Sequence, residues 1–140
     1  MSRHAALLVF APNLAGEQFL QALSEGGELF VALACNPDQQ QHLYELGVEN
    51  VIEFNIKEKH LKQLPTKEFS KVYIFEEQLG QCYQVLEVIR QWTCGTIYVI
   101  TKNHYPQMIY KALGADFVIR TASDDLSFLL DKCKHTEGGL

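Results

Sequence analysis

Short, mostly apolar runs alternate along the chain with segments in which apolar residues recur every three or four positions. Apolar runs of this kind are typical of parallel strands covered on both faces, and the longer spacing is typical of amphipathic helices. The pattern predicts strands at residues 5–10, 29–34, 48–54, 71–75, 96–100 and 117–120. It predicts helices at residues 16–23, 37–46, 57–64, 78–92, 106–113 and 124–133.

Residues that suit helix caps and stops mark the helix boundaries. Asn36 is a natural N-cap before Pro37 at the first helical position, and Ser123 is placed to cap the last helix. Glycines follow three of the predicted helices, at Gly26, Gly47 and Gly114. The longest helix, 78–92, has a predicted buried stripe that consists of Leu79, Cys82, Tyr83, Leu86 and Ile89.

Six strands that alternate with helices predict an α/β fold of three layers, with a parallel sheet between two layers of helices. The Rossmann-like strand order 3-2-1-4-5-6 accommodates all six strands. The chain of 140 residues, 47% of them apolar, is long enough for one such domain. We expect the domain to occupy residues 1–133 and the tail, 134–140, to be frayed.

The turn at residues 11–16, between the first strand and the first helix, lies where an open α/β sheet binds its ligands. A dinucleotide-binding turn reads Gly-x-Gly-x-x-Gly: the glycines permit the tight turn, the approach of the pyrophosphate and close helix–strand packing, respectively. Here Ala11 and Asn13 take the first two places and Gly16 the third, while Pro12 lacks a backbone N–H. The loss of these two glycines and of one N–H favours an unliganded strand–helix turn capped by Asn13. If a ligand does bind, its phosphates are expected to be fewer or differently placed.

Two further strand ends face the predicted crevice. The second strand ends in Ala34-Cys35-Asn36, without the carboxylate that usually holds a ribose; Asn36 either bonds a ribose or, the favoured reading, caps a helix. The fourth strand ends in Glu76-Glu77. These carboxylates either attract a cation or, as we favour, begin the long helix, where negative charge is stabilising.

Composition excludes several classes of function. The net charge of −5 argues against generic nucleic-acid binding. No apolar run approaches the roughly 18 residues of a membrane span, and the chain enters its first strand without room for a signal peptide. Four cysteines without a C-x-x-C pair argue against a metal knuckle or a disulfide framework, and favour a reduced, cytoplasmic setting.

No catalytic constellation is visible in the sequence. The five histidines are scattered, and none is paired with a serine or cysteine at a recognisable turn. Cys35 is the only thiol expected near the crevice, and Lys102-Asn103-His104 belongs either to the crevice rim or to a solvated loop. We therefore predict a protein that is not an enzyme, with no catalytic and no metal-ligating residues.

The order of several motifs resembles a known family. These motifs are residues 30–33 leading to Asn36-Pro37-Asp38, the segments 43–47 and 57–64, and above all 110–119, which contains Gly114-Ala115-Asp116. Over about residues 5–130, the chain resembles the N-terminal Rossmann domain of potassium-transport regulators, of the RCK or TrkA-N type.

The resemblance implies a ligand pocket and partners. Members of the family bind nucleotides or cations at the first turn and second strand, dimerise, and control potassium channels or transporters from the cytoplasmic side. Carried over by position, the cofactor-binding residues are Ala11, Pro12, Asn13, Leu14, Gly16, Asn36 and Asn55, and the strand-end Glu76 completes the set.

The sequence departs from the family at its ligand-binding positions. Two fingerprint glycines and the ribose acid are missing, and Glu53-Phe54-Asn55 stands where Gly-Asp usually follows the third strand. The expected cofactor is therefore NAD(H) or an adenine nucleotide bound weakly, or none.

Three hypotheses of function follow. The first is a regulatory, non-catalytic domain that senses a nucleotide or cation and acts as a homodimer on a membrane potassium channel or transporter. The second is a degenerate Rossmann domain that serves in dimerisation or protein interaction through the exposed side of helix 78–92. The third is an NmrA-like NAD(P)-binding protein, suggested by Ala32-Leu33 before Asn36-Pro37. A phosphoacceptor receiver is disfavoured, because Ala11-Pro12 replaces its acidic pair.

Overall fold

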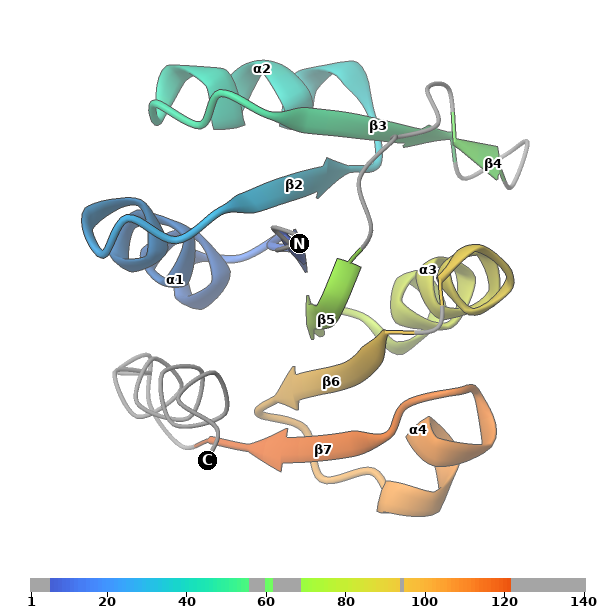
Figure 1. The fold of residues 1–140 in the computed structure, drawn as a ribbon. Coiled ribbons are helices and arrows are strands. Elements are labelled where there is room, and N and C mark those ends of the chain that lie inside the picture. The colour runs from blue at the N-terminus through green and yellow to red at the C-terminus, as the bar shows by residue number, and fades with distance from the viewer. Residues whose placement is uncertain (1–5, 56–59, 62–68, 94, 122–140) are drawn as a thin grey trace, which may run out of the picture.

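A computed structural model describes residues 6–55, 60–61, 69–93 and 95–121. Strands and helices alternate through most of this part of the chain (Figure 1). The strands are β1 (Ala6–Phe10), β2 (Phe30–Ala34), β3 (Val51–Asn55), β4 (His60–Leu61), β5 (Phe69–Phe75), β6 (Thr96–Thr101) and β7 (Phe117–Arg120). The helices are α1 (Leu14–Glu25), α2 (Pro37–Glu45), α3 (Leu79–Trp92) and α4 (Gln107–Ala112).

The strands form a single sheet in the order β4-β3-β2-β1-β5-β6-β7. All pairings are parallel except that of β3 with β4. The six parallel strands confirm the predicted order 3-2-1-4-5-6, and β4 adds a short antiparallel strand at the β3 edge. In Figure 1, α1 and α2 lie on one side of the sheet and α3 and α4 on the other, which confirms the three-layer α/β architecture.

Side chains of the central strands alternate between two cores. Leu8 and Phe10 of β1 face the core that includes residues of α3 and α4, such as Leu86 and Tyr110. Leu7 and Val9 of β1 belong to the second core, which includes residues of α1 and α2. Because helices cover both faces, the strands are apolar at consecutive positions, and this explains the uninterrupted runs in the sequence.

Several predicted elements need correction or lie outside the described residues. The helix predicted at 57–64 is wrong at His60–Leu61, which pair with β3 as β4; the rest of that segment lies outside the described residues. The third strand begins at Val51 rather than at residue 48, because Gly47 and Val48 complete the turn after α2. The helix predicted at 124–133, its cap Ser123 and the tail at 134–140 also lie outside the described residues.

The buried stripe of α3 differs from the prediction at one position. Tyr83 is 44% exposed, and Val85 is buried beside Cys82, Leu86 and Ile89. Positions 82, 85, 86 and 89 lie on one face of a helix with 3.6 residues per turn, whereas position 83 is rotated by about 100° from position 82 and lies outside that face.

Gly16 lies where α1 packs closely against the sheet. A Cβ atom at this position would lie 2.6 Å from Ala11 Cβ and 3.2 Å from Cγ of Phe75. The first of these distances is far below van der Waals contact, so even a methyl group must move α1 or the end of β1. This confirms the role predicted for Gly16 as the glycine that allows close helix–strand packing.

We expect Gly16→Ala to lower the free energy of unfolding by about 1–3 kcal/mol, because it overpacks a buried contact. Gly80→Ala is the matched control: it also lies in the first turn of a helix, and a Cβ there meets nothing within 4 Å. Gly80→Ala should leave stability unchanged or raise it by up to about 1 kcal/mol. Urea unfolding monitored by circular dichroism measures both, and equal effects would contradict the close contact.

The buried cysteines should be chemically inert in the folded protein. Burial raises the pKa of the Cys35 thiol to about 12; burial, followed by the nearby Glu76 carboxylate, raises the pKa of the Cys82 thiol to about 12. Because the reactive species is the thiolate, iodoacetamide at about pH 8 should leave both residues unmodified in the native state and modify both in urea. Peptide mapping by mass spectrometry distinguishes the sites, and rapid native labelling of Cys35 would contradict the inert assignment.

Candidate functional site

A crevice of about 400 Å³ opens at the carboxyl ends of the central strands. Its walls come from the start of α1, the end of β5, the end of β6 and the residue after β7. The chain leaves β1 for a helix on one face of the sheet and leaves β5 for a helix on the other, so the crevice lies at the topological switch point. The residues that line it are Asn13, Leu14, Ala15, Phe75, Glu76, Glu77, Ile100, Thr101, Lys102, Asn103 and Thr121.

Asn13 is the N-cap of α1. Its side-chain Oδ1 accepts a hydrogen bond from the backbone N–H of Gly16 at 2.9 Å, and its backbone oxygen accepts one from the N–H of Glu17 at 3.0 Å. The capping interaction satisfies one of the amides that a phosphate at this helix end would otherwise bond. The turn thus has the capped geometry that the sequence favoured over a pyrophosphate cradle.

The other residues of the first turn have different positions. Leu14 stands at the crevice rim and is 58% exposed, whereas Ala11 is buried beneath the turn against Gly16. Pro12, which has no N–H, is partly buried and is absent from the crevice lining. Of the residues predicted in this turn, Asn13 and Leu14 therefore line the crevice, whereas Ala11 and Gly16 do not line it and pack against each other beneath the turn.

Glu76 is the most unusual residue of the crevice, because it carries a carboxylate and is only 5% exposed. One carboxylate oxygen, Oε1, accepts hydrogen bonds from Nδ2 of Asn103 at 2.9 Å, from the hydroxyl of Tyr110 at 2.7 Å and from Oγ1 of Thr101. The other oxygen, Oε2, is buried and has no hydrogen-bond partner among the described residues. A buried carboxylate oxygen without a partner is costly, so it marks a position where a ligand's donor or a cation would be favourable.

The interpretation that Glu76 begins the long helix is wrong. The N-cap of α3 is Gln78, and the backbone N–H of Glu76 donates to the carbonyl of Ile100 at 2.9 Å. This bond extends the pairing of β5 with β6 beyond the last strand residue. Glu76 is thereby held at the sheet, with its side chain turned toward α4 rather than toward solvent.

Tyr110 supplies a permanent hydrogen-bond donor to this carboxylate. Its ring is fully buried on α4, and burial, followed by the hydrogen bond to Glu76, raises the pKa of its hydroxyl. The hydroxyl therefore stays protonated across the physiological pH range. The sequence placed Glu76 at the crevice and left Asn103 either at the crevice rim or in a solvated loop, and the structure places it at the crevice. It gave no role to Thr101 or Tyr110; the polar segment that begins at the end of the fifth strand was the available signal for Thr101.

The remaining predicted residues lie elsewhere. Asn36 is the N-cap of α2, where its Oδ1 accepts from the N–H of Gln39 at 2.7 Å, and it does not line the crevice. Asn55 ends β3, and its side chain lies outside the described residues. Lys102 and Asn103 line the crevice, but His104 does not.

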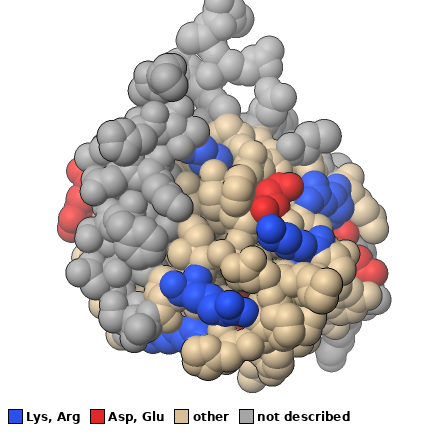
Figure 2. All heavy atoms as spheres, turned by 90° about the horizontal axis from the view of Figure 1, so that it is seen from below, with Lys and Arg blue, Asp and Glu red and all other residues tan. Residues whose placement is uncertain are grey.

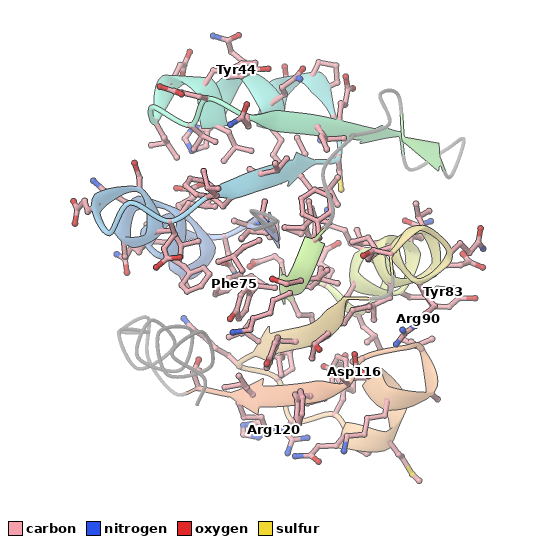
Figure 3. All side chains as sticks on the ribbon, in the orientation of Figure 1. Tyr44, Phe75, Tyr83, Arg90, Asp116 and Arg120 are labelled. Carbon is pink, nitrogen blue, oxygen red and sulfur yellow. The ribbon has the colours of Figure 1, made fainter. Side chains whose placement is uncertain are left out.

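The Gly114-Ala115-Asp116 segment has a structural role. Oδ2 of Asp116 accepts from the N–H of Ile97 at 2.8 Å, and the N–H of Asp116 donates to the Ile97 carbonyl at 2.9 Å. The Arg90 guanidinium donates to the carbonyl of Gly114 and lies 3.9 Å from the Asp116 carboxylate, and Figure 3 shows these two side chains directed toward one another. The segment thus aligns the start of β7 with β6 and α3, away from the crevice.

The crevice combines acidic, basic and amide groups. It offers a buried carboxylate, a second acid in Glu77, one lysine and amide groups. Among the described residues, no group of three or more His, Cys, Asp or Glu side chains is placed to hold a metal ion. In the same part of the chain, no helix is both long and apolar enough to cross a membrane.

This chain is similar to known proteins in structure, while its sequence matches none significantly. No protein-family model matches the sequence, and no curated protein matches it significantly. The solved GsuK channel bound to NAD superposes with a TM-score of 0.65 at 18% identity, over 84% of this chain and 21% of that chain. The chain thus spans about a fifth of the channel's length.

Two isolated domains match over nearly their whole length. The NAD(P)-binding domain of an exopolyphosphatase-related protein from Archaeoglobus fulgidus has a TM-score of 0.68 at 16% identity, over 94% of this chain and 98% of that one. The TrkA-N domain of the inner membrane protein ybaL from Escherichia coli has a TM-score of 0.61 at 16% identity, over 94% and 97%. The chain therefore has the Rossmann-like fold that the RCK and TrkA-N domains share.

Proposed function

We propose that this chain is a regulatory, non-catalytic domain that senses a small ligand, a nucleotide or a cation, in the crevice at the ends of β1, β5 and β6. The proposal rests mainly on the burial and the incomplete hydrogen bonding of the Glu76 carboxylate. This carboxylate is buried at the switch point of the sheet, three donors converge on one of its oxygens, and its other oxygen has no partner among the described residues.

The same crevice is poorly suited to a pyrophosphate in the usual pose. The N–H of Gly16 already donates to the side chain of Asn13, and Pro12 has no N–H to donate. The carboxylates of Glu76 and Glu77 also repel phosphate. A hydrogen-bond donor such as a ribose hydroxyl or an exocyclic amine fits Oε2 of Glu76 better than an anion does. The likeness to NAD-bound GsuK supports a nucleotide as ligand, and the crevice chemistry supports weaker or altered binding of it.

The similarity in fold supports a role for this domain as a regulator of a membrane protein. Its likeness to part of the GsuK channel and to a TrkA-N domain supports a cytoplasmic homodimer that acts on a potassium channel or transporter. Such a domain works by population shift, since a ligand that binds one dimer arrangement better than another changes their ratio.

A thermal-shift panel with NAD(H), AMP, ADP, ATP and divalent cations tests the proposal. A ligand that binds the native state raises the melting temperature by mass action, and at a hundred times its Kd it contributes about 2.7 kcal/mol. At least one member of the panel should raise the melting temperature. If none does so at millimolar concentration, or if hydride transfer occurs with NADPH and a carbonyl substrate, the proposal fails.

Two substitutions at one position test whether a nucleotide's phosphate approaches the start of α1. Asn13→Asp and Asn13→Ser both preserve the N-cap, but only Asn13→Asp adds a negative charge at the crevice. The shift caused by a nucleotide should disappear in Asn13→Asp and persist in Asn13→Ser. Equal shifts in both variants would place the phosphates away from this helix end.

Glu76→Gln tests whether Glu76 binds the ligand. The amide oxygen still accepts from Thr101, Asn103 and Tyr110, so the NH2 group stands in place of Oε2, where it neither accepts from a nucleotide's donor nor attracts a cation. A charge at about 4 Å contributes about 1 kcal/mol even at the dielectric constant of water, so cation affinity should fall at least roughly fivefold, and nucleotide affinity should fall as well. Isothermal titration calorimetry measures both constants, and unchanged affinities would remove Glu76 from the site.

A further inference from the structure

A second hollow, distinct from the crevice, runs along the outer side of α1. It has a volume of about 490 Å³. One wall is a stripe of α1 at helical spacing, from Leu14 and Glu17 through Gln21 to Glu25, and the other wall is the turn after α2, at residues 46–48. This space is called the α1 groove below. Because the stripe extends along the whole of α1, the groove is about 18 Å long.

The α1 groove has an apolar floor and exposed apolar rims. Leu20 and Val48 are buried in its floor, whereas Leu14 and Leu46 at its edges are 58% and 50% exposed. These rim residues are not needed to cover the core beneath α1, which is filled by Phe19, Leu20 and Leu23. Exposed leucines on both edges of a hollow are typical of an interaction site.

Apart from its two histidines, one of which (His42) lies with Nε2 3.0 Å from Oε2 of Glu17, the segment 4–56 carries charge of a single sign. Residues 4–56 contain seven acidic residues and no Lys or Arg. Glu17 and Glu25 stand at the groove itself. Every Lys and Arg that the structure describes lies in β5 or later, at Lys71, Arg90, Lys102, Lys111 and Arg120. Figure 2 shows basic side chains, in blue, on the face seen from below.

We infer that the α1 groove is a docking site for an amphipathic helix of a partner protein, with an apolar face for the groove and Lys or Arg on its flanks. The length of α1 matches about three turns of such a helix, and binding of this kind uses apolar anchors spaced by three and four residues. Flanking basic residues meet Glu17 and Glu25 at the groove, and the acidic surroundings steer the approach of a basic helix.

Two other occupants fit the observations less well. A second copy of this chain, docked groove to groove about a twofold axis, brings acid against acid and gains no charge complementarity. An anionic membrane is repelled by the same surface. The inference is independent of the crevice and of its ligand, so the two proposals fail separately.

A defined peptide tests the inference. The probe is a fluorescein-labelled helix of about 14 residues with Leu at every third or fourth position and Lys on both flanks, compared with the same peptide carrying Glu in place of Lys. Fluorescence anisotropy at about 0.15 M salt reports binding to the full chain. The Lys peptide should bind at least tenfold more tightly than the Glu peptide, and equal binding of the two, or no binding, overturns the proposal.

Matched variants locate the binding site. Glu17→Lys combined with Glu25→Lys should weaken the Lys peptide at least tenfold. Glu45→Lys combined with Glu49→Lys changes net charge equally outside the groove lining and should weaken it less than threefold. Equal losses in the two pairs would show general attraction to an acidic protein, and would overturn docking in the groove.

Steric variants keep the test valid if the charge variants fold poorly. Gln21→Trp fills the exposed middle of the groove and Leu46→Ser removes an apolar rim, and each should weaken the Lys peptide at least fivefold while leaving the melting temperature within a few degrees. Undiminished binding to both overturns the proposal. Sedimentation velocity supplies a last check: self-association that Leu46→Ser abolishes would assign the groove to a second copy and overturn the heterologous partner.

Discussion

The contact between Gly16 and the end of β1 is the constraint on which the crevice end of the molecule depends. The absence of a side chain at Gly16 lets α1 begin directly on Ala11 and Phe75. This close approach sets the direction of α1, and with it the positions of Asn13 at the crevice and of the α1 stripe at the groove. The other two fingerprint glycines serve the tight turn and the approach of a pyrophosphate rather than this packing, and the turn forms here with Ala11 and Asn13 in their places.

Glu76 is the corresponding element on the other side of the crevice. Its Oε1 joins the end of β6, the segment after it and α4, through Thr101, Asn103 and Tyr110. The three donors on Oε1 compensate much of the desolvation free energy of that oxygen. The desolvation of Oε2, which has no partner among the described residues, is not compensated. A residue that served only stability would be better replaced by an apolar one of similar size. The retained carboxylate is the physical reason to regard this crevice as a binding site.

The fold was predictable from the sequence, because a parallel sheet covered on both faces requires runs such as 6–10 and 30–34, and helical periodicity specifies what joins them. Gly16 and Asn36 were also predictable, since close packing and capping depend on local sequence. The partners of Glu76 were not, because Tyr110 is 34 positions away and reaches it only through the crossover from β6 to α4. β4 was missed because two strand residues carry no periodicity. Tyr83 was predicted to be buried and is exposed. A tyrosine side chain, with an apolar ring and a polar hydroxyl, suits the edge between the buried and exposed sides of a helix as well as the core.

Helix α1 belongs to both candidate sites, and this shapes what each can do. Its first residue, Leu14, lines the crevice and the α1 groove, whereas Asn13 and Glu25 stand at opposite ends of a helix of about 18 Å. A ligand at the crevice and a helix in the groove therefore contact the same rigid element without competing for the same atoms. Any preference of one for a particular position of α1 must appear as an equal change in the affinity of the other, since coupling between two binding sites is reciprocal. Gly16 limits the size of that coupling, because the contact with Ala11 leaves α1 little room to move at its first turn.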